Sequence, residues 1–192
     1  RTFKESLQKA VRSLEIDRHS LDGRYINSDD LSTGELENKL RTNCWDKLWY
    51  VAEALRRKMP VEEVFALTKI DPWFLNNIND IIKLEGKIKS RRASSVENRL
   101  SSTQLRKAKE YGFSDKYLGS LLGTEELDVR KRRRDLGINA VYKTVDTCAA
   151  EFEATTPYLY SSFESECEAN PTDRRKVIIL GGGPNRIGQG IE

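Results

Sequence analysis

Apolar residues along most of the chain recur about every three or four positions, which is the spacing of an amphipathic α-helix. The longest such period begins at Asp71–Pro72, where the aspartate can cap a helix and the proline suits its first turn. Its apolar positions are Phe74, Leu75, Ile78, Ile81, Ile82, Leu84 and Ile88. The pattern therefore predicts one long helix over residues 71–88.

Shorter helical periods flank this helix on both sides. They span residues 3–14, 33–40, 47–55, 61–67, 102–111, 114–122 and 124–136. Candidate caps are Ser32 or Thr33, Asp46, and Ser101 with Gln104 in a capping box, and candidate stops are Gly112, Gly123 and Gly137. Residues 16–30 lack a sustained period, and we interpret them as a linker. The polar stretch 89–95 predicts a surface loop between two helical groups.

The pattern changes after Gly137. Val141, Tyr142 and Val145 lie among polar residues with no helical period, and aromatic residues from Tyr158 to Phe163 alternate with smaller side chains. This pattern predicts extended chain that lies over one domain on its way to the next.

A continuous apolar run, Val177–Leu180, leads directly into a glycine-rich loop at the end of the sequence. Such a run is typical of a strand buried on both faces of a parallel sheet. A parallel sheet needs crossover connections and further strands. We therefore expect the first strand of an α/β domain that is incomplete here.

The loop fits neither common phosphate-binding motif. Beginning at Gly181, the dinucleotide fingerprint would require glycine where Arg186 stands. The P-loop spacing is met by Gly183 and Gly188, but its lysine and hydroxyl residue are replaced by Gln189 and Gly190. A tight strand-to-helix turn is the favoured interpretation.

Composition restricts the chemistry of the chain. Its 192 residues are 38% hydrophobic and 33% charged, and no apolar run approaches the length of a membrane helix. The N-terminus lacks the apolar core of a signal peptide. One histidine and three widely spaced cysteines exclude most zinc sites and catalytic triads. We expect no membrane partner and reduced thiols.

A basic run, Arg130–Arg134, suggests nucleic-acid binding as an alternative function. The net charge is only +3, and Asp128 and Asp135 flank the run. A helix distributes consecutive residues around its circumference, and no aromatic residue interrupts the run as a stacking platform. The sequence favours a solvated helix face.

Clustered carboxylates raise two further alternatives. Asp146 and Glu151 could do acid–base work, but nothing near them in the sequence indicates a cleft. Hydrogen bonding to loop backbone is the favoured interpretation. The alternating acids Glu164, Glu166 and Glu168, with Cys167, suggest a metal site, but alternating acids on an exposed segment are usually solvated. We expect no catalytic, cofactor or metal site in this chain.

Three stretches resemble the carbamoyl phosphate synthetase large subunit, and they follow one another along the chain in the same order as in that family. LGGGPNRIGQGIE, residues 180–192, is similar to the start of its second synthetase half. VYKTVDTCAAEF with YLYSSFESECEANP, residues 141–152 and 158–171, is similar to the segment leading into that half. RTFKESLQKAVRSLE, residues 1–15, is similar to the segment closing the first half. The middle resembles the family's oligomerisation domain more loosely.

The resemblance implies a mainly α connecting and oligomerisation domain. Residues 1–18 would end the first, carboxyphosphate half, residues 19–170 would form the helical domain with its extended linker, and residues 171–192 would begin the second half. The parent enzyme would make carbamoyl phosphate from bicarbonate, two ATP and ammonia from glutamine, for pyrimidine and arginine synthesis. Its ATP, magnesium and potassium sites would lie outside this chain.

The resemblance also implies partners and sites. Gly190 and Glu192 would line the internal passage that carries carbamate between the halves. The partners would be other large-subunit copies and the glutaminase small subunit, in the cytoplasm or, in a plant, the plastid. For association between copies we choose the 71–88 helix from its residues, because its apolar face is the longest and two aromatic residues lie at its head. The candidate surface comprises Trp73, Phe74, Ile78, Ile81 and Ile82, although Trp73 and Phe74 could also serve the core. Trp45 and Trp49 are further large side chains for the core or an interface.

Overall fold

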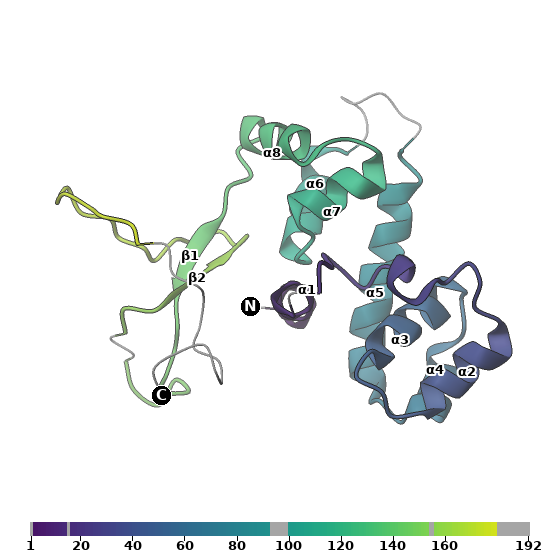
Figure 1. The fold of residues 1–192 in the computed structure, drawn as a ribbon. Coiled ribbons are helices and arrows are strands. Elements are labelled where there is room, and N and C mark those ends of the chain that lie inside the picture. The colour runs from purple at the N-terminus through teal and green to yellow at the C-terminus, as the bar shows by residue number, and fades with distance from the viewer. Residues whose placement is uncertain (1, 15, 93–99, 154–155, 180–192) are drawn as a thin grey trace.

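Helix α5 (Pro72–Lys89) is the longest helix in the described part of the chain, and two groups of shorter helices lie beside its two halves (Figure 1). The computed structural model describes residues 2–14, 16–92, 100–153 and 156–179. The predicted start of α5 is confirmed, because Asp71 accepts a hydrogen bond of 2.8 Å from the Trp73 amide and Pro72 occupies the first turn.

One helical group packs against the first half of α5. It comprises α2 (Thr33–Arg41), α3 (Lys47–Arg56) and α4 (Val61–Thr68). Ser32 starts α2 through a capping box with Glu35, whereas Asp46 precedes α3 without making a side-chain cap. Trp49 is fully buried and is the largest side chain of this core.

A second helical group packs against the other half of α5. It comprises α6 (Ser102–Glu110), α7 (Asp115–Leu122) and α8 (Glu126–Asp135). The predicted capping box of Ser101 with Gln104 is present at the start of α6. Gly112, Gly123 and Gly137 each follow a helix with positive φ, which confirms them as stops.

Helix α5 supplies apolar side chains to both cores. Leu75, Ile78 and Ile82 belong to the first core, while Ile81 and Ile88 belong to the second. The apolar side chains of this helix are therefore buried within the chain itself, in two different cores. The burial of these apolar side chains stabilises the packing of both helical groups against α5.

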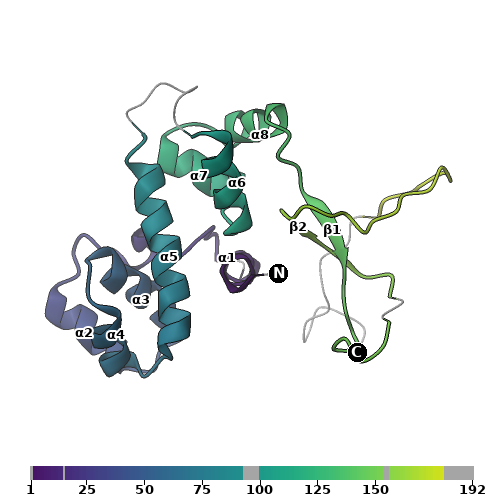
Figure 2. The same ribbon diagram turned by 180° about the vertical axis from the view of Figure 1, so that it is seen from behind.

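Helix α1 (Phe3–Ser13) lies between α5 and the C-terminal strands, as the opposite views of Figures 1 and 2 both show. Lys4 Nζ contacts Asn77 Oδ1 at 2.9 Å and Asp80 Oδ2 at 3.2 Å on α5. Gln8 Nε2 donates to Tyr111 O at 2.8 Å, in the turn after α6. The predicted N-terminal helix thus bridges several elements.

The extended chain expected after Gly137 forms a small antiparallel hairpin. Strand β1 (Val141–Thr144) pairs with β2 (Leu159–Ser162), with Val141 opposite Ser162 and Thr144 opposite Leu159. The Glu168 amide extends the pairing by donating to Tyr142 O at 2.7 Å. The sequence predicted extended chain here but not this pairing.

The linker interpretation of residues 16–30 is wrong. This stretch contains the short 3₁₀ helix η1 (Gly23–Ile26), and it buries Leu21 and Ile26 in the first core. Two arginines of the α3 region hold its backbone, because the Arg56 side chain donates to Leu21 O and Arg57 Nη2 donates to Ser28 O at 2.7 Å. The stretch has too few apolar residues to show a helical period, yet Leu21 and Ile26 are buried in the core.

The strand expected at Val177–Leu180 is not formed where the structure describes it. Val177, Ile178 and Ile179 lie outside any strand and are each 85–88% exposed. A strand requires a neighbour to take its hydrogen bonds, and the described residues place none beside this run. Leu180 and the glycine-rich loop lie outside the described residues.

Candidate functional site

The predicted association surface on α5 divides into a buried part and an exposed part. Ile78, Ile81 and Ile82 are at most 6% exposed, because they fill the two cores on either side of the helix. They are therefore unavailable to a partner, and their inclusion in the surface was wrong. Trp73 and Phe74, at the head of the helix, remain 56% and 42% exposed.

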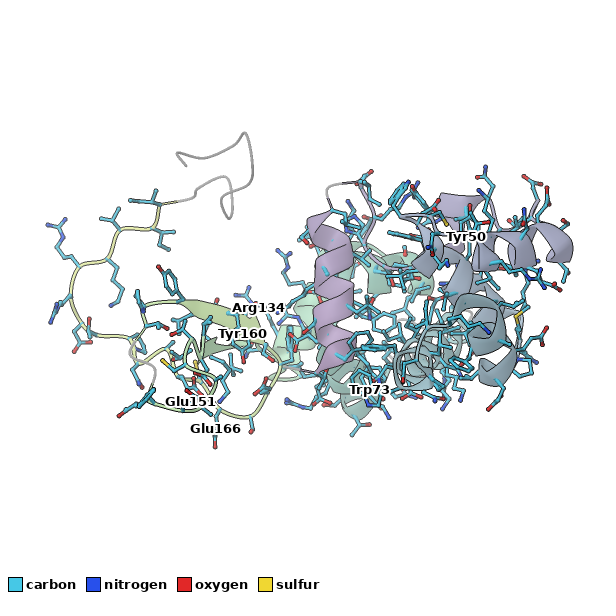
Figure 3. The ribbon with its side chains drawn as sticks, turned by 90° about the horizontal axis from the view of Figure 1, so that it is seen from below. Tyr50, Trp73, Arg134, Glu151, Tyr160 and Glu166 are labelled. Carbon is cyan, nitrogen blue, oxygen red and sulfur yellow. The ribbon has the colours of Figure 1, made fainter. Side chains whose placement is uncertain are left out.

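The two exposed aromatic side chains form a cluster with Phe3 of α1. The Trp73 and Phe74 rings lie 5.0 Å apart edge to face, and Phe3 lies 5.3 Å from each of them. We call Phe3, Trp73 and Phe74 the aromatic cluster. Figure 3 shows Trp73 on the helical body, apart from Tyr160, Glu151 and Glu166 on the hairpin side.

Polar groups border the aromatic cluster. Lys4 follows Phe3 in α1 and joins Asn77 and Asp80 on the next turns of α5. Asn77 Nδ2 also donates to the backbone oxygen of Trp73 at 2.8 Å, one turn earlier in α5. An apolar aromatic centre with a polar rim is the usual anatomy of a protein–protein interface.

Trp45 and Trp49 have different environments. Trp49 is buried, whereas Trp45 is 67% exposed and lies edge to face with Tyr25 at 5.6 Å and Trp49 at 6.1 Å. The expectation that some of these large side chains fill the core is confirmed for Trp49.

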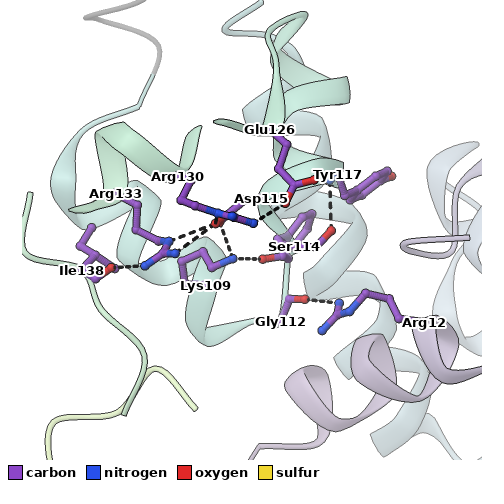
Figure 4. Close-up of polar contacts among 11 residues, drawn as sticks. Arg12, Lys109, Gly112, Ser114, Asp115, Tyr117, Glu126, Arg130, Arg133 and Ile138 are labelled. Atoms are coloured by element: carbon purple, nitrogen blue, oxygen red, sulfur yellow. Dashed lines mark hydrogen bonds and ion pairs between the residues drawn. The ribbon is translucent and has the colours of Figure 1, made fainter. Parts of the chain in front are cut away.

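Part of the basic run on α8 is used inside the protein (Figure 4). Arg133 Nε and Nη2 both lie 3.2 Å from Asp115 Oδ2, and Arg133 Nη1 donates to Ile138 O at 2.7 Å. Lys109 Nζ donates to the other oxygen of Asp115 at 2.7 Å. We call Lys109, Asp115 and Arg133 the charged triad, and it joins α6, α7 and α8.

These contacts argue against the nucleic-acid alternative. Arg130 pairs with Glu126 at 2.6 Å on the same helix, so it too is partly neutralised. The remaining cations are divided between faces of α8, and nothing in the described residues supports the alternative. Arg130 and Arg133 of the run make ion pairs that fix the helix.

A second buried polar network joins the two helical groups. Arg56 Nε and Nη2 lie 2.8 and 2.9 Å from the two oxygens of Glu85, and the Tyr117 hydroxyl donates to Glu85 Oε2 at 2.9 Å. Burial and the nearby charge of Glu85 raise the pKa of Tyr117 well above its ordinary value. Tyr117 therefore remains a proton donor at neutral pH.

Neither network was predicted from the sequence, although one signal was present. Glu85 interrupts the apolar period of α5 between Ile82 and Ile88, and Lys109 follows the buried Ala108 of α6. A charge at a position where the period demands an apolar residue indicates a buried pair.

The other candidate carboxylates have structural partners. Asp146 accepts hydrogen bonds from the Cys148 and Ala150 amides at 2.9 and 2.8 Å, which confirms its interpretation as a loop residue. Glu168 accepts from Lys143 Nζ and the Thr144 amide, both at 2.7 Å, and these bonds lower its pKa. In the described part of the chain, acidic, histidine and cysteine side chains nowhere gather into a potential metal site.

Two further findings concern the membrane and the predicted passage. None of the helices in the described ranges combines the length and apolar character that a membrane crossing needs. Gly190 and Glu192, the predicted lining of the carbamate passage, lie outside the described residues.

Comparison with known proteins relates the chain to one family. The family described as carbamoyl-phosphate synthetase large chain, oligomerisation domain, matches residues 1–137. Carbamoyl phosphate synthase large chains from Pseudomonas syringae pv. tomato, Pseudomonas aeruginosa and Archaeoglobus fulgidus are 50%, 49% and 46% identical to this chain over its whole length. The chain spans 18% of the length of each of these relatives. It belongs to the oligomerisation-domain family of the carbamoyl phosphate synthase large chain.

Proposed function

We propose that this chain holds large-subunit copies together through the aromatic cluster at the head of α5. The observation that supports this is the exposure of Trp73 and Phe74 in a helix whose other large apolar side chains are mostly buried. Exposed aromatic groups that lie together are characteristic of interface hot spots. A two-fold axis through the patch would bring each cluster against its own copy.

The parent protein is proposed to be a glutamine-dependent carbamoyl phosphate synthase, an ATP-dependent carbon–nitrogen ligase. The names of the relatives and the sequence resemblance support this assignment. In it, ATP, magnesium and potassium act in the synthetase halves, the small subunit supplies ammonia from glutamine, and the enzyme works in the cytoplasm or plastid. This chain contributes association and connection and no catalytic group.

The domain boundaries and the passage remain part of the proposal. Residues 1–18 end the first half, residues 19–170 form the connecting domain, and residues 171–192 begin the second half. Gly190 and Glu192 line the carbamate passage, and the small size of Gly190 suits a wall that must leave space open. Resemblance alone supports these assignments.

The association proposal is tested in the full large subunit by changing Trp73 and Phe74 together to glutamate. Burying a carboxylate in an apolar interface is strongly unfavourable, so the subunit should sediment as a smaller species. Carbamoyl phosphate synthesis should stay largely intact because no catalytic group is altered. Phe152→Glu is the matched control, since Phe152 is 75% exposed and lies far along the chain. Unchanged association in the double variant would contradict the proposal.

A further inference from the structure

Phe163 follows strand β2 and lies over two cations of the helical body. Its ring centroid is 4.9 Å from Lys109 Nζ and 5.4 Å from Arg133 Cζ, which is within the range of cation–π interaction. The ring also packs, partly buried, against the second core. A single side chain thus combines apolar and electrostatic contact with α6 and α8.

The two cations are already fixed before Phe163 contacts them. Lys109 is 5% exposed, and its ammonium group donates to Phe113 O at 2.6 Å as well as to Asp115. Arg133 is held by Asp115 and Ile138 O. Docking the ring therefore orders no additional charged side chain, so the entropy cost of ordering these two cations does not oppose it.

Neighbouring residues of the same segment dock onto α1. Ser162 is buried, and its hydroxyl donates to Glu5 Oε2 at 3.1 Å. Lys9 pairs with Glu5 at 2.9 Å and also donates to Ser161 O. Three consecutive residues, 161–163, therefore contact the helical body at separate points.

The hairpin needs these contacts to stay ordered. Its strands span only Val141–Thr144 and Leu159–Ser162, and an isolated two-stranded hairpin is marginal in water. Phe152 and Tyr158 contribute little burial, since they are 75% and 64% exposed, and Tyr160 in β2 is half-buried. Phe163 is the aromatic side chain of this region that contacts the second core.

We propose that Phe163, seated on the charged triad, is the latch that fixes the β1–β2 hairpin, and with it the direction of the chain after residue 163, to the helical body. This role goes beyond association. It makes the connecting segment a rigid extension of α6–α8, so a displacement of those helices is transmitted to the chain that follows. In this arrangement Arg133, the member of the basic run that belongs to the charged triad, helps to hold the hairpin in place.

Hydrogen–deuterium exchange of the 192-residue chain tests the latch with Phe163→Ala against Phe152→Ala. The reporters are the Val145 amide, which donates to Tyr158 O at 2.9 Å, and the Glu168 amide, which donates to Tyr142 O. In Phe163→Ala both should exchange about tenfold faster, as expected from losing desolvated cation–π contacts, while α5 amides keep their protection. Phe152→Ala should match the wild type. Wild-type exchange at both reporters in Phe163→Ala would overturn the proposal.

Phe163→Leu separates the two parts of the contact and covers the case in which the alanine variant unfolds. Leucine keeps much of the apolar packing but has no π-face for the cations. The proposal predicts partial protection of the two reporter amides. Full wild-type protection with leucine would contradict a role for the cations. Arg133→Gln should also raise the exchange rates of the two reporter amides. Arg134→Gln, which changes an exposed residue of the same run, should leave these rates unchanged.

Discussion

Gly112 has no room for any side chain. Its φ of +87° lies in the left-handed region, and a Cβ added there would lie 2.9 Å from Glu5 Cα. The Gly112 carbonyl also accepts a hydrogen bond from Arg12 Nη1 at 2.7 Å. One residue therefore both ends the α6 segment and allows α1 to approach.

Gly112→Ala should lower the free energy of unfolding by about 2–4 kcal/mol, because left-handed backbone strain and the contact with Glu5 add together. Gly86→Ala is the matched control, since Gly86 lies within α5 and has nothing within 4 Å of an added Cβ. It should raise stability by about 0.5–1 kcal/mol through helix propensity. Urea denaturation followed by circular dichroism measures both. Equal effects from the two substitutions would contradict the account of Gly112.

Asp115 is the shared acceptor of the charged triad. Burial alone would raise its pKa, but the charge of Lys109 and hydrogen bonds from Lys109 and Arg133 outweigh burial and lower it. Because the pKa is lower in the folded than in the unfolded state, the ionised carboxylate stabilises the fold at neutral pH. That contribution is lost as the pH falls through the folded pKa.

Asp115→Asn should therefore lower the free energy of unfolding by about 3 kcal/mol at neutral pH, where it leaves Lys109 and Arg133 without their buried anion. The difference from wild type should stay constant above about pH 5 and shrink below about pH 4, the range of an unperturbed carboxyl. Denaturation curves across pH provide the measurement. A difference that does not change with pH would show that the charge of Asp115 is not what stabilises the triad.

At the scale of elements, local patterns predicted the helices well. The Ser32 and Ser101 capping boxes, the Asp71–Pro72 start and the glycine stops depend on neighbouring residues, so they are visible in sequence. The burial of Leu21 and Ile26 within residues 16–30 and the β1–β2 pairing depend on contacts between distant segments. The spacing of apolar residues along the sequence gives no information about such contacts. The same reason explains why Glu85 and Lys109 were missed as network residues.

The division of α5 is the clearest case. Its apolar period predicted the helix but not the number of partners around it, so Ile78, Ile81 and Ile82 were assigned to a surface. In the structure they line two separate cores. Only the two aromatic residues at the helix head retain the exposure that the predicted surface requires.

Ile81→Ala should consequently lower the free energy of unfolding by about 2–5 kcal/mol, the usual cost of a large-to-small change in a packed core. Trp73→Ala should cost much less stability, since Trp73 is 56% exposed, yet it should weaken association. Denaturation and sedimentation of the two variants distinguish the roles. If the Ile81→Ala chain kept its stability but no longer associated, the result would show that Ile81 serves the interface and not the core.

At the scale of the whole molecule, three contacts of different kinds organise the chain. Helix α5 contributes to both cores, and α1 lies between α5 and the hairpin (Figures 1 and 2). Phe163 fixes the hairpin to the charged triad. The aromatic cluster at the head of α5 and α1 remains exposed outside this framework. A helical body that presents such an aromatic patch is suited to joining identical copies.

Sedimentation equilibrium of the 192-residue chain over a concentration series measures whether the aromatic cluster joins two copies. The wild type and Phe152→Glu should increase in average mass with concentration toward a dimer. The Trp73→Glu, Phe74→Glu double variant should remain a monomer over the same range, with unchanged helical content by circular dichroism. A wild-type chain that stays monomeric at high concentration, or a folded double variant that associates as the wild type does, would contradict association through the aromatic cluster.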